Sequence, residues 1–237
     1  MMPSPSRLII RNLSSVLDLF LPQPCPGCRS AILNHQEHLC MHCSLTLPYT
    51  QFETLRNHPL EKLFWGRIPF GFASATWYFL DHSPIQHIIH AIKYEHQHVL
   101  GIHMGKQMGL RVQQLITDFP IDLLVPMPLH PKKEIKRGYN QAELLCKGIA
   151  MTTGIPIGNR AIQRTVQTKT QTRKSRSERW DNVHTAFSVA QPTAIHSKNI
   201  AIVDDVITTG ASLEACGRSA LLHGASSVSF LGMAFTA

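Results

Sequence analysis

No apolar run in this 237-residue sequence reaches the ~18 residues needed to cross a bilayer, so we expect no membrane span. Internal repeats and low-complexity segments are also absent. Charged residues make up only 16% beside 43% hydrophobic residues, a balance typical of a globular protein rather than a disordered one. Near the N-terminus, the apolar stretch that follows Arg7 and Arg11 is short and interrupted by Asp18. A secretory signal peptide is therefore the less favoured alternative, and we expect a cytoplasmic protein.

Acidic residues are outnumbered, with 15 Asp and Glu against 23 Lys and Arg, which gives a net charge of +8 and a pI near 9.4. A basic balance of this kind favours anionic partners such as phosphates, nucleic acid or acidic surfaces. Composition alone does not separate a phosphate-handling enzyme from a nucleic-acid-binding protein, and both alternatives stay open.

The six cysteines are not spread over the chain as a disulfide framework would be. Cys146 and Cys216 lie in apolar helical patterns, and the other four form two C-x-x-C pairs separated by eleven residues: Cys25, Cys28, Cys40 and Cys43. Two such pairs can surround a Zn²⁺ ion with four thiolates and leave no open position, so the predicted role is structural. An iron–sulfur site is the main rival, and His38 or His42 is an alternative ligand. This clustering, in place of a disulfide framework, also suits a reducing compartment.

The chain is long enough for one α/β domain and a small appendage. Helical periodicity at residues 9–20 precedes the cysteines, and residues 44–70 look irregular because prolines recur there. From residue 70 the pattern predicts strands and helices in alternation: strand 72–80, a helix starting at Ser83-Pro84, helix 101–116, strand 123–125, helix 141–152, strands 185–190 and 199–204, helix 211–223 and strand 226–235. We therefore predict a doubly wound α/β fold with a largely parallel sheet, divided into residues 1–68 and 69–237.

The segment VDDVITTGAS, residues 203–212, carries the most informative pattern. An apolar strand at 200–203 leads into Asp204 and Asp205, and Thr208, Thr209, Gly210 and Ser212 follow around the start of the next helix. In such sheets ligands bind at the carboxyl ends of strands, and a helix start offers free N–H groups to a phosphate. Two carboxylates can accept hydrogen bonds from the vicinal hydroxyls of an attached sugar. The plainer alternative is a pair of aspartates that cap a helix.

Two basic segments accompany this loop. The first, within residues 125–145, follows a predicted strand and contains Lys132, Lys133, Lys136, Arg137, Gly138 and Tyr139; it is a second candidate anion site or a solvated turn. The second, residues 164–183, is polar throughout and contains Arg164, Lys169, Arg173, Lys174, Arg176 and Arg179. A long polar stretch inside a compact domain is often functional, and this one could also contact nucleic acid or be disordered.

The run VDDVITTGAS closely resembles the phosphoribosyl-pyrophosphate (PRPP) signature of type I phosphoribosyltransferases. The resemblance implies that Asp204 and Asp205 hold the ribose 2′ and 3′ hydroxyls, and that Mg²⁺ binds through the pyrophosphate and ribose oxygens. The 5′-phosphate would lie against Val206, Ile207, Thr208, Thr209, Gly210, Ala211 and Ser212. It also implies that the first basic segment is the pyrophosphate loop, and that the second, with Arg164 and Arg176, is a flexible catalytic loop that closes over PRPP.

The whole set of motifs resembles the competence-associated ComF family. The matching pieces are the cysteine module, Lys93-Tyr94, RGYNQAELL at 137–145, the polar loop at 164–187 and VDDVITTGAS. This resemblance implies a role in natural transformation, with single-stranded DNA and a helicase or channel of the uptake machinery as partners. Three functions remain in competition: transfer of phosphoribosyl to an unknown nitrogen acceptor, single-stranded DNA binding, and non-catalytic sensing of PRPP or a nucleotide.

Overall fold

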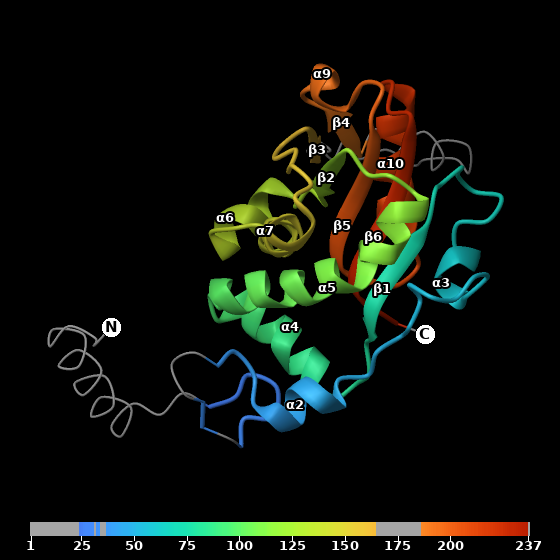
Figure 1. The fold of residues 1–237 in the computed structure, drawn as a ribbon. Helices are drawn as coiled ribbons and strands as arrows, with labels where there is room; N and C mark the ends of the chain where they lie inside the picture. Colours follow the sequence, from blue (N-terminus) through green and yellow to red (C-terminus); the bar gives the residue numbers. More distant parts are fainter. Residues whose placement is uncertain (1–23, 31, 34–36, 165–185, 237) are drawn as a thin grey trace, which may run out of the picture.

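The computed structural model describes residues 24–30, 32–33, 37–164 and 186–236 (Figure 1). Its centre is a four-stranded sheet with the order β1-β6-β5-β2, in which all neighbours are parallel. The strands are β1 (Ala73–Tyr78), β2 (Leu123–Pro126), β5 (Asn199–Ile207) and β6 (Ser227–Phe235). The predicted α/β fold with a parallel sheet is therefore confirmed.

Helices cover both faces of this sheet, which explains why β2 and β6 are buried along almost their whole length. One face carries α4 (Pro84–Tyr94), α5 (His98–Asp118) and α7 (Gln141–Thr153) (Figure 1). The other carries α10 (Ala211–Leu222) and the short α3 (Pro59–Lys62). Two apolar cores result, one on each side of the sheet.

Helix α4 begins where the sequence predicted, with Ser83 as N-cap and Pro84 in the first turn. Helix α5 begins three residues earlier than predicted and ends two residues later, at Asp118. Strand β5 is also longer than expected, because Val206 and Ile207 still pair with β6. The two aspartates therefore lie within the strand, and the loop proper is reduced to residues 208–210.

Three other segments differ from the sequence predictions. Residues 131–137 form a short helix, α6 (Pro131–Arg137), and not a turn. Strand β4 (Phe187–Val189) exists but pairs antiparallel with an unforeseen β3 (Ile162–Arg164), outside the main sheet. The stretch 44–70 is not irregular throughout, because it includes the end of α2 (Met41–Thr46) and all of α3, and it buries Phe52, Leu60 and Phe64 against the sheet. A last short helix, α9 (Pro192–Ile195), precedes β5. The helix predicted at 9–20 lies outside the described residues.

Candidate functional site

The turn between β5 and α10 has the geometry that an anion site requires. Gly210 is the N-cap of α10 and adopts a left-handed conformation with φ of 69°. A Cβ atom at this position would lie 2.9 Å from the ring of Phe64, so the turn needs glycine for its conformation and for its space. Residues 204 and 206–213 line a small open hollow at the start of this twelve-residue helix. The free N–H groups of the first helical turn face such a site.

A network of ion pairs supports the loop from the neighbouring segment. Arg67 donates from its guanidinium to the carbonyl oxygen of Thr209 over 3.2 Å and pairs with Glu214. Glu214 also pairs with Arg218 on the next turn of α10 at 3.0 Å, and Arg218 donates to the carbonyl of Arg67. The sequence analysis missed Arg67 and Phe64. No sequence signal could have revealed them, because both reach the loop from more than a hundred residues away.

Asp205 is largely buried in a small, mostly apolar enclosure on the α4–α7 side of the sheet. Its Oδ1 accepts from Lys93 Nζ at 2.9 Å, and its Oδ2 accepts from Gln141 Nε2 at 2.6 Å. The remaining walls of the enclosure are aliphatic: Ile89, Ile92, Leu145 and Met233. Both carboxylate oxygens are therefore engaged by protein donors.

Asp204 has different surroundings, although it is the adjacent residue. It is partly exposed and borders the hollow of the phosphate-type loop. Burial raises the pKa of the Asp204 carboxyl to about 7, with a further contribution from the Asp205 charge. The backbone N–H of Asp205, which donates to Asp204 Oδ1 at 2.8 Å, opposes that rise, as do the charges of Lys93 and Arg164. Asp204 is thus a carboxyl that changes its charge near neutral pH.

The first basic segment comprises α6 and the start of α7, and its Gln141 is hydrogen-bonded to Asp205. Lys132 and Lys133 are exposed on α6, and Gly138 ends that helix in a left-handed conformation. The Arg137 guanidinium lies over the ring of Tyr94, at 5.2 Å from its centroid. The Tyr139 hydroxyl donates to the carbonyl of Ile92. These two contacts join the segment to the last turn of α4, which carries Lys93.

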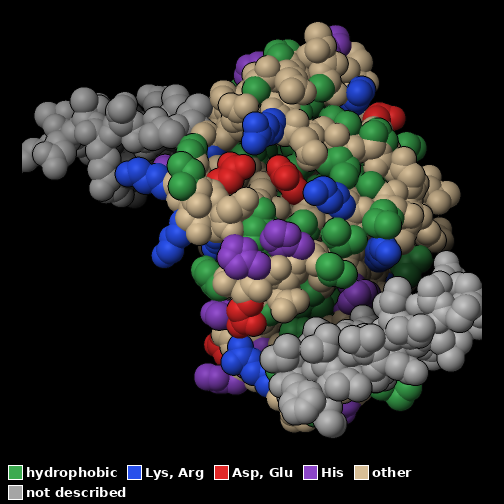
Figure 2. Space-filling view, turned by 90° about the vertical axis from the view of Figure 1, so that its left-hand side faces the viewer, with side chains coloured by type: hydrophobic (Ala, Val, Ile, Leu, Met, Phe, Trp, Pro, Cys, Tyr) green, Lys and Arg blue, Asp and Glu red, His purple; other side chains and the backbone are tan. Residues whose placement is uncertain are grey.

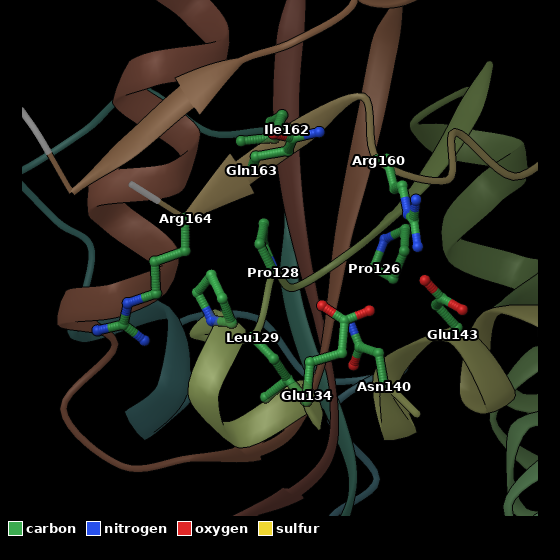
Figure 3. A pocket seen from close by; sticks show the side chains of 11 residues that line it. Pro126, Pro128, Leu129, Glu134, Asn140, Glu143, Arg160, Ile162, Gln163 and Arg164 are labelled. Carbon is green, nitrogen blue, oxygen red and sulfur yellow. The ribbon is translucent and has the colours of Figure 1, made fainter. Parts of the chain in front are cut away.

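Arg164 is the one described arginine of the predicted catalytic loop. It ends β3, lies over the ring of Phe187 at 5.5 Å, and lines a cavity of about 320 Å³ (Figure 3). Figure 3 shows that Glu134 and Glu143 also face this cavity, with Arg160 near Glu143. The other residues predicted for this loop lie outside the described part of the chain: Lys169, Arg173, Lys174, Arg176 and Arg179.

The four predicted cysteine ligands come together as a compact cluster. The sulfur atoms of Cys25, Cys28, Cys40 and Cys43 all lie within 4.8 Å of one another. A tetrahedral zinc with bonds of about 2.3 Å has sulfur–sulfur edges of about 3.8 Å, and the Sγ atoms of Cys28 and Cys40 are 3.7 Å apart. Backbone N–H groups also point at these sulfurs, from Cys43 to Cys40 Sγ and from Cys40 to Cys25 Sγ, each at 3.4 Å. The cluster therefore has the donor set and dimensions of a zinc module.

The cysteine cluster is attached along α4. The carbonyl of Gly27 lies 2.7 Å from His87 Nδ1, and a Cβ atom built on Gly27 would lie 3.4 Å from the Cβ of Pro84 at the start of the helix. At the other end, Arg29 pairs with Glu95 at 3.3 Å. Contacts at both ends of the helix fix the module against the α/β domain.

Comparison with known proteins finds relatives that are named for competence and for DNA utilization. The chain is 26% identical over 214 residues to competence protein F of Haemophilus influenzae, and the match covers 89% of each chain. The chain is homologous to competence protein F. It is also 28% identical over 148 residues to the DNA utilization protein YhgH of Escherichia coli K12, where the match covers 61% of this chain and 64% of that protein. No family model matches the sequence.

Among solved structures, the chain is similar to the glutamine phosphoribosylpyrophosphate (PRPP) amidotransferase of B. subtilis complexed with ADP and GMP. It superposes with a TM-score of 0.42 and 18% identity, over 57% of this chain and 26% of that one. Among the residues that the structure describes, no helix combines the length and the apolar character needed to span a bilayer.

Proposed function

We propose that this protein binds PRPP at the carboxyl end of β5 and transfers its 5-phosphoribosyl group to a nitrogen acceptor. The observation that carries the proposal is the turn at residues 208–212, where a left-handed glycine opens a twelve-residue helix beside the carboxyl of Asp204. Such a turn suits a phosphate, and the adjacent carboxyl suits the hydroxyls of the attached ribose.

The roles of the individual residues follow from this placement. Residues 206–212 hold the 5′-phosphate, and Asp204 of the acidic pair contributes to ribose binding. Mg²⁺ would bind to this protein through the pyrophosphate and ribose oxygens of the ligand. There it would neutralise negative charge on the pyrophosphate leaving group. The basic residues of the pyrophosphate segment, Lys132, Lys133 and Arg137, supply further positive charge. Gly138 and Tyr139 connect that segment to α7.

In the reaction, the acceptor nitrogen forms a bond to ribose C1 while the bond from C1 to the pyrophosphate oxygen breaks. The electron pair leaves with pyrophosphate, and the acceptor loses a proton. Positive charge that develops on the ribose resembles that in glycoside hydrolysis. Arg164 and Arg176 of the catalytic loop are our candidates for stabilising the leaving group, and positioning would supply much of the rate enhancement.

We further propose that the cysteine cluster binds a structural Zn²⁺ ion. Four thiolates leave no position open for substrate or water, and the module is too short to build its own core. We divide the chain at residues 68/69 into this N-terminal part and the α/β domain, although Phe52, Leu60 and Phe64 pack against that domain. Limited proteolysis, with cleavage expected near the boundary, tests this division.

The homologues suggest the process in which the activity is used. One is named a competence protein and another a DNA utilization protein. We propose that this protein likewise serves DNA uptake or use, with a helicase or channel of that machinery as a partner. The clustering of four cysteines into a metal-type site favours a reducing compartment such as the cytoplasm, which we propose as the location.

Single-stranded DNA binding is the second candidate function, and a surface feature favours it. Arg137 of α6 lies over the exposed ring of Tyr94, and the exposed ring of His98 meets the half-buried ring of Tyr139 edge to face at 4.2 Å, so aromatic rings and a cation share this surface. Bases can stack on such rings while the cations contact phosphates. Figure 2 shows, however, that acidic side chains lie among the basic ones on this side of the molecule. A steep decrease of affinity with salt would support this function.

Calorimetric titration of Mg²⁺·PRPP into the purified protein tests the first proposal. Asp204→Asn should weaken binding strongly, and the exposed Asp81→Asn serves as the matched control that should leave it unchanged. A screen of nitrogen acceptors for pyrophosphate release then separates an enzyme from a sensor. Absence of PRPP binding by the native protein would refute the transferase proposal and leave single-stranded DNA as the ligand to test.

A further inference from the structure

The two adjacent aspartates are not equivalent, although the sequence motif presents them as a pair. Asp204 borders the open hollow at the loop, while only 8% of Asp205 is exposed. Asp205 has one oxygen bonded to Lys93 and the other to Gln141, inside an enclosure with no room for a water molecule. Each carboxylate oxygen could accept a second hydrogen bond, but no water-sized space adjoins these donors, so a sugar hydroxyl could reach Asp205 only if Lys93 or Gln141 moved away.

The orientation of Gln141 shows how strongly Asp205 requires donors. The side chain is buried and its Oε1 atom has no hydrogen-bond partner. The reversed amide would place Oε1 against the Asp205 carboxylate, so the carboxylate determines which way the amide points. In the observed orientation Gln141 Oε1 has no partner, while both carboxylate oxygens of Asp205 receive a hydrogen bond.

Lys93 is located where the acidic pair meets the predicted pyrophosphate segment. One hydrogen of its ammonium is directed to Asp205, at 2.9 Å, and about one fifth of its side chain is exposed. The next residue, Tyr94, lies under Arg137, and the preceding carbonyl, of Ile92, accepts from Tyr139. Its charge also lowers the pKa of Asp204, which places Lys93 within electrostatic reach of both carboxyls.

We propose that Lys93 binds the pyrophosphate group of PRPP and that Asp205 is the residue that positions its ammonium, while Asp204 alone binds the ribose hydroxyls. This inference rests on the proposed ribose-phosphate function and adds to it a specificity-determining lysine. An ammonium has three donors, and the contact with Asp205 uses one of them, so the others remain for phosphate oxygens. Fixing a flexible lysine in advance reduces the entropy lost when the ligand binds.

The test compares PRPP with ribose 5-phosphate, which lacks the pyrophosphate, by calorimetry in excess Mg²⁺. The double variant Lys93→Met/Asp205→Asn removes both charges together, so no unpaired charge remains in the enclosure and folding is preserved; thermal melting checks this. We expect PRPP affinity to decrease roughly 10- to 100-fold, as for loss of a hydrogen bond to a charged group. Ribose 5-phosphate affinity should change less than about threefold.

Three further variants make the comparison specific. Lys93→Arg keeps the charge and should retain most of the PRPP preference. Lys147→Met removes an exposed lysine from α7 and should have no effect on either ligand. Asp204→Asn should weaken both ligands, because both contain the ribose.

The outcomes separate this inference from the proposed function. If the double variant weakened both ligands equally, or neither, Lys93 would not be a pyrophosphate ligand and the inference would be wrong, while the ribose-phosphate site would stand. The same conclusion would follow if the native protein bound both ligands with equal affinity. If the native protein bound neither ligand, the proposed function itself would fail, and this inference with it.

Discussion

Asp204→Asn should stabilise the protein above neutral pH, because the ionised Asp204 carboxylate is unfavourable in the folded state. Its pKa is about 7 in the folded protein and near 4 in an unfolded chain, so between these values the folded state binds more protons. Stability from this group is therefore fully present below about pH 4 and is lost as the pH rises through 7. The full difference corresponds to about 4 kcal/mol, and partial exposure of Asp204 reduces our expectation to about 2–4 kcal/mol.

Urea unfolding at pH 5, 6, 7 and 8 measures this effect as the difference between the variant and the native protein. Asparagine has nearly the same shape but no charge, so the difference should grow steadily with pH and level off near pH 8. Asp81→Asn, at an exposed site, should give a difference that does not change with pH. Parallel stability profiles for Asp204→Asn and the native protein would show that the carboxyl is not destabilised, and would refute the reasoning.

Three other predictions concern the loop and the cysteine cluster. Gly210→Ala should destabilise the protein by about 1–3 kcal/mol, because it adds left-handed backbone strain and a clash with Phe64. Gly138→Ala introduces similar strain without a clash. Equal decreases in melting temperature for the two variants would therefore contradict the packing argument. Arg67→Ala should weaken PRPP binding without abolishing it, because the carbonyl of Thr209 loses its donor; unchanged affinity in calorimetry would show that the loop needs no such support. A strong chelator should release one zinc per chain and lower the melting temperature, measured by metal analysis and calorimetry; a zinc-free protein with unchanged melting would exclude a structural metal.

Local chemistry made part of the site predictable. The strand, the acidic pair and the helix start at 211 follow from an apolar run, two carboxylates and a glycine within a dozen residues. The cysteine cluster was predictable for the same reason, since metal-ligand spacing is itself local. The sequence could not show where β5 ends, because Val206 and Ile207 look equally suited to a loop or to a strand paired with β6.

Contacts between distant segments account for most of what was missed. Nothing local distinguishes Asp204 from Asp205; the difference comes from α4 and α7, which bring Lys93 and Gln141 to only one of them. Strand β3 was missed because three residues are too few to show a period, and its partner β4 lies more than twenty residues further on. The lysine-rich α6 buries no residue, so it had no apolar stripe from which a helix could be recognised.

The attachment of the cysteine module along α4 has a consequence for the whole molecule. This eleven-residue helix carries Lys93 in its last turn, and the module contacts it at Pro84, His87 and Glu95. A shift of the module relative to the helix would therefore also move the lysine that pairs with Asp205. Metal occupancy and ligand affinity would then be thermodynamically coupled, and each would report on the other in a titration.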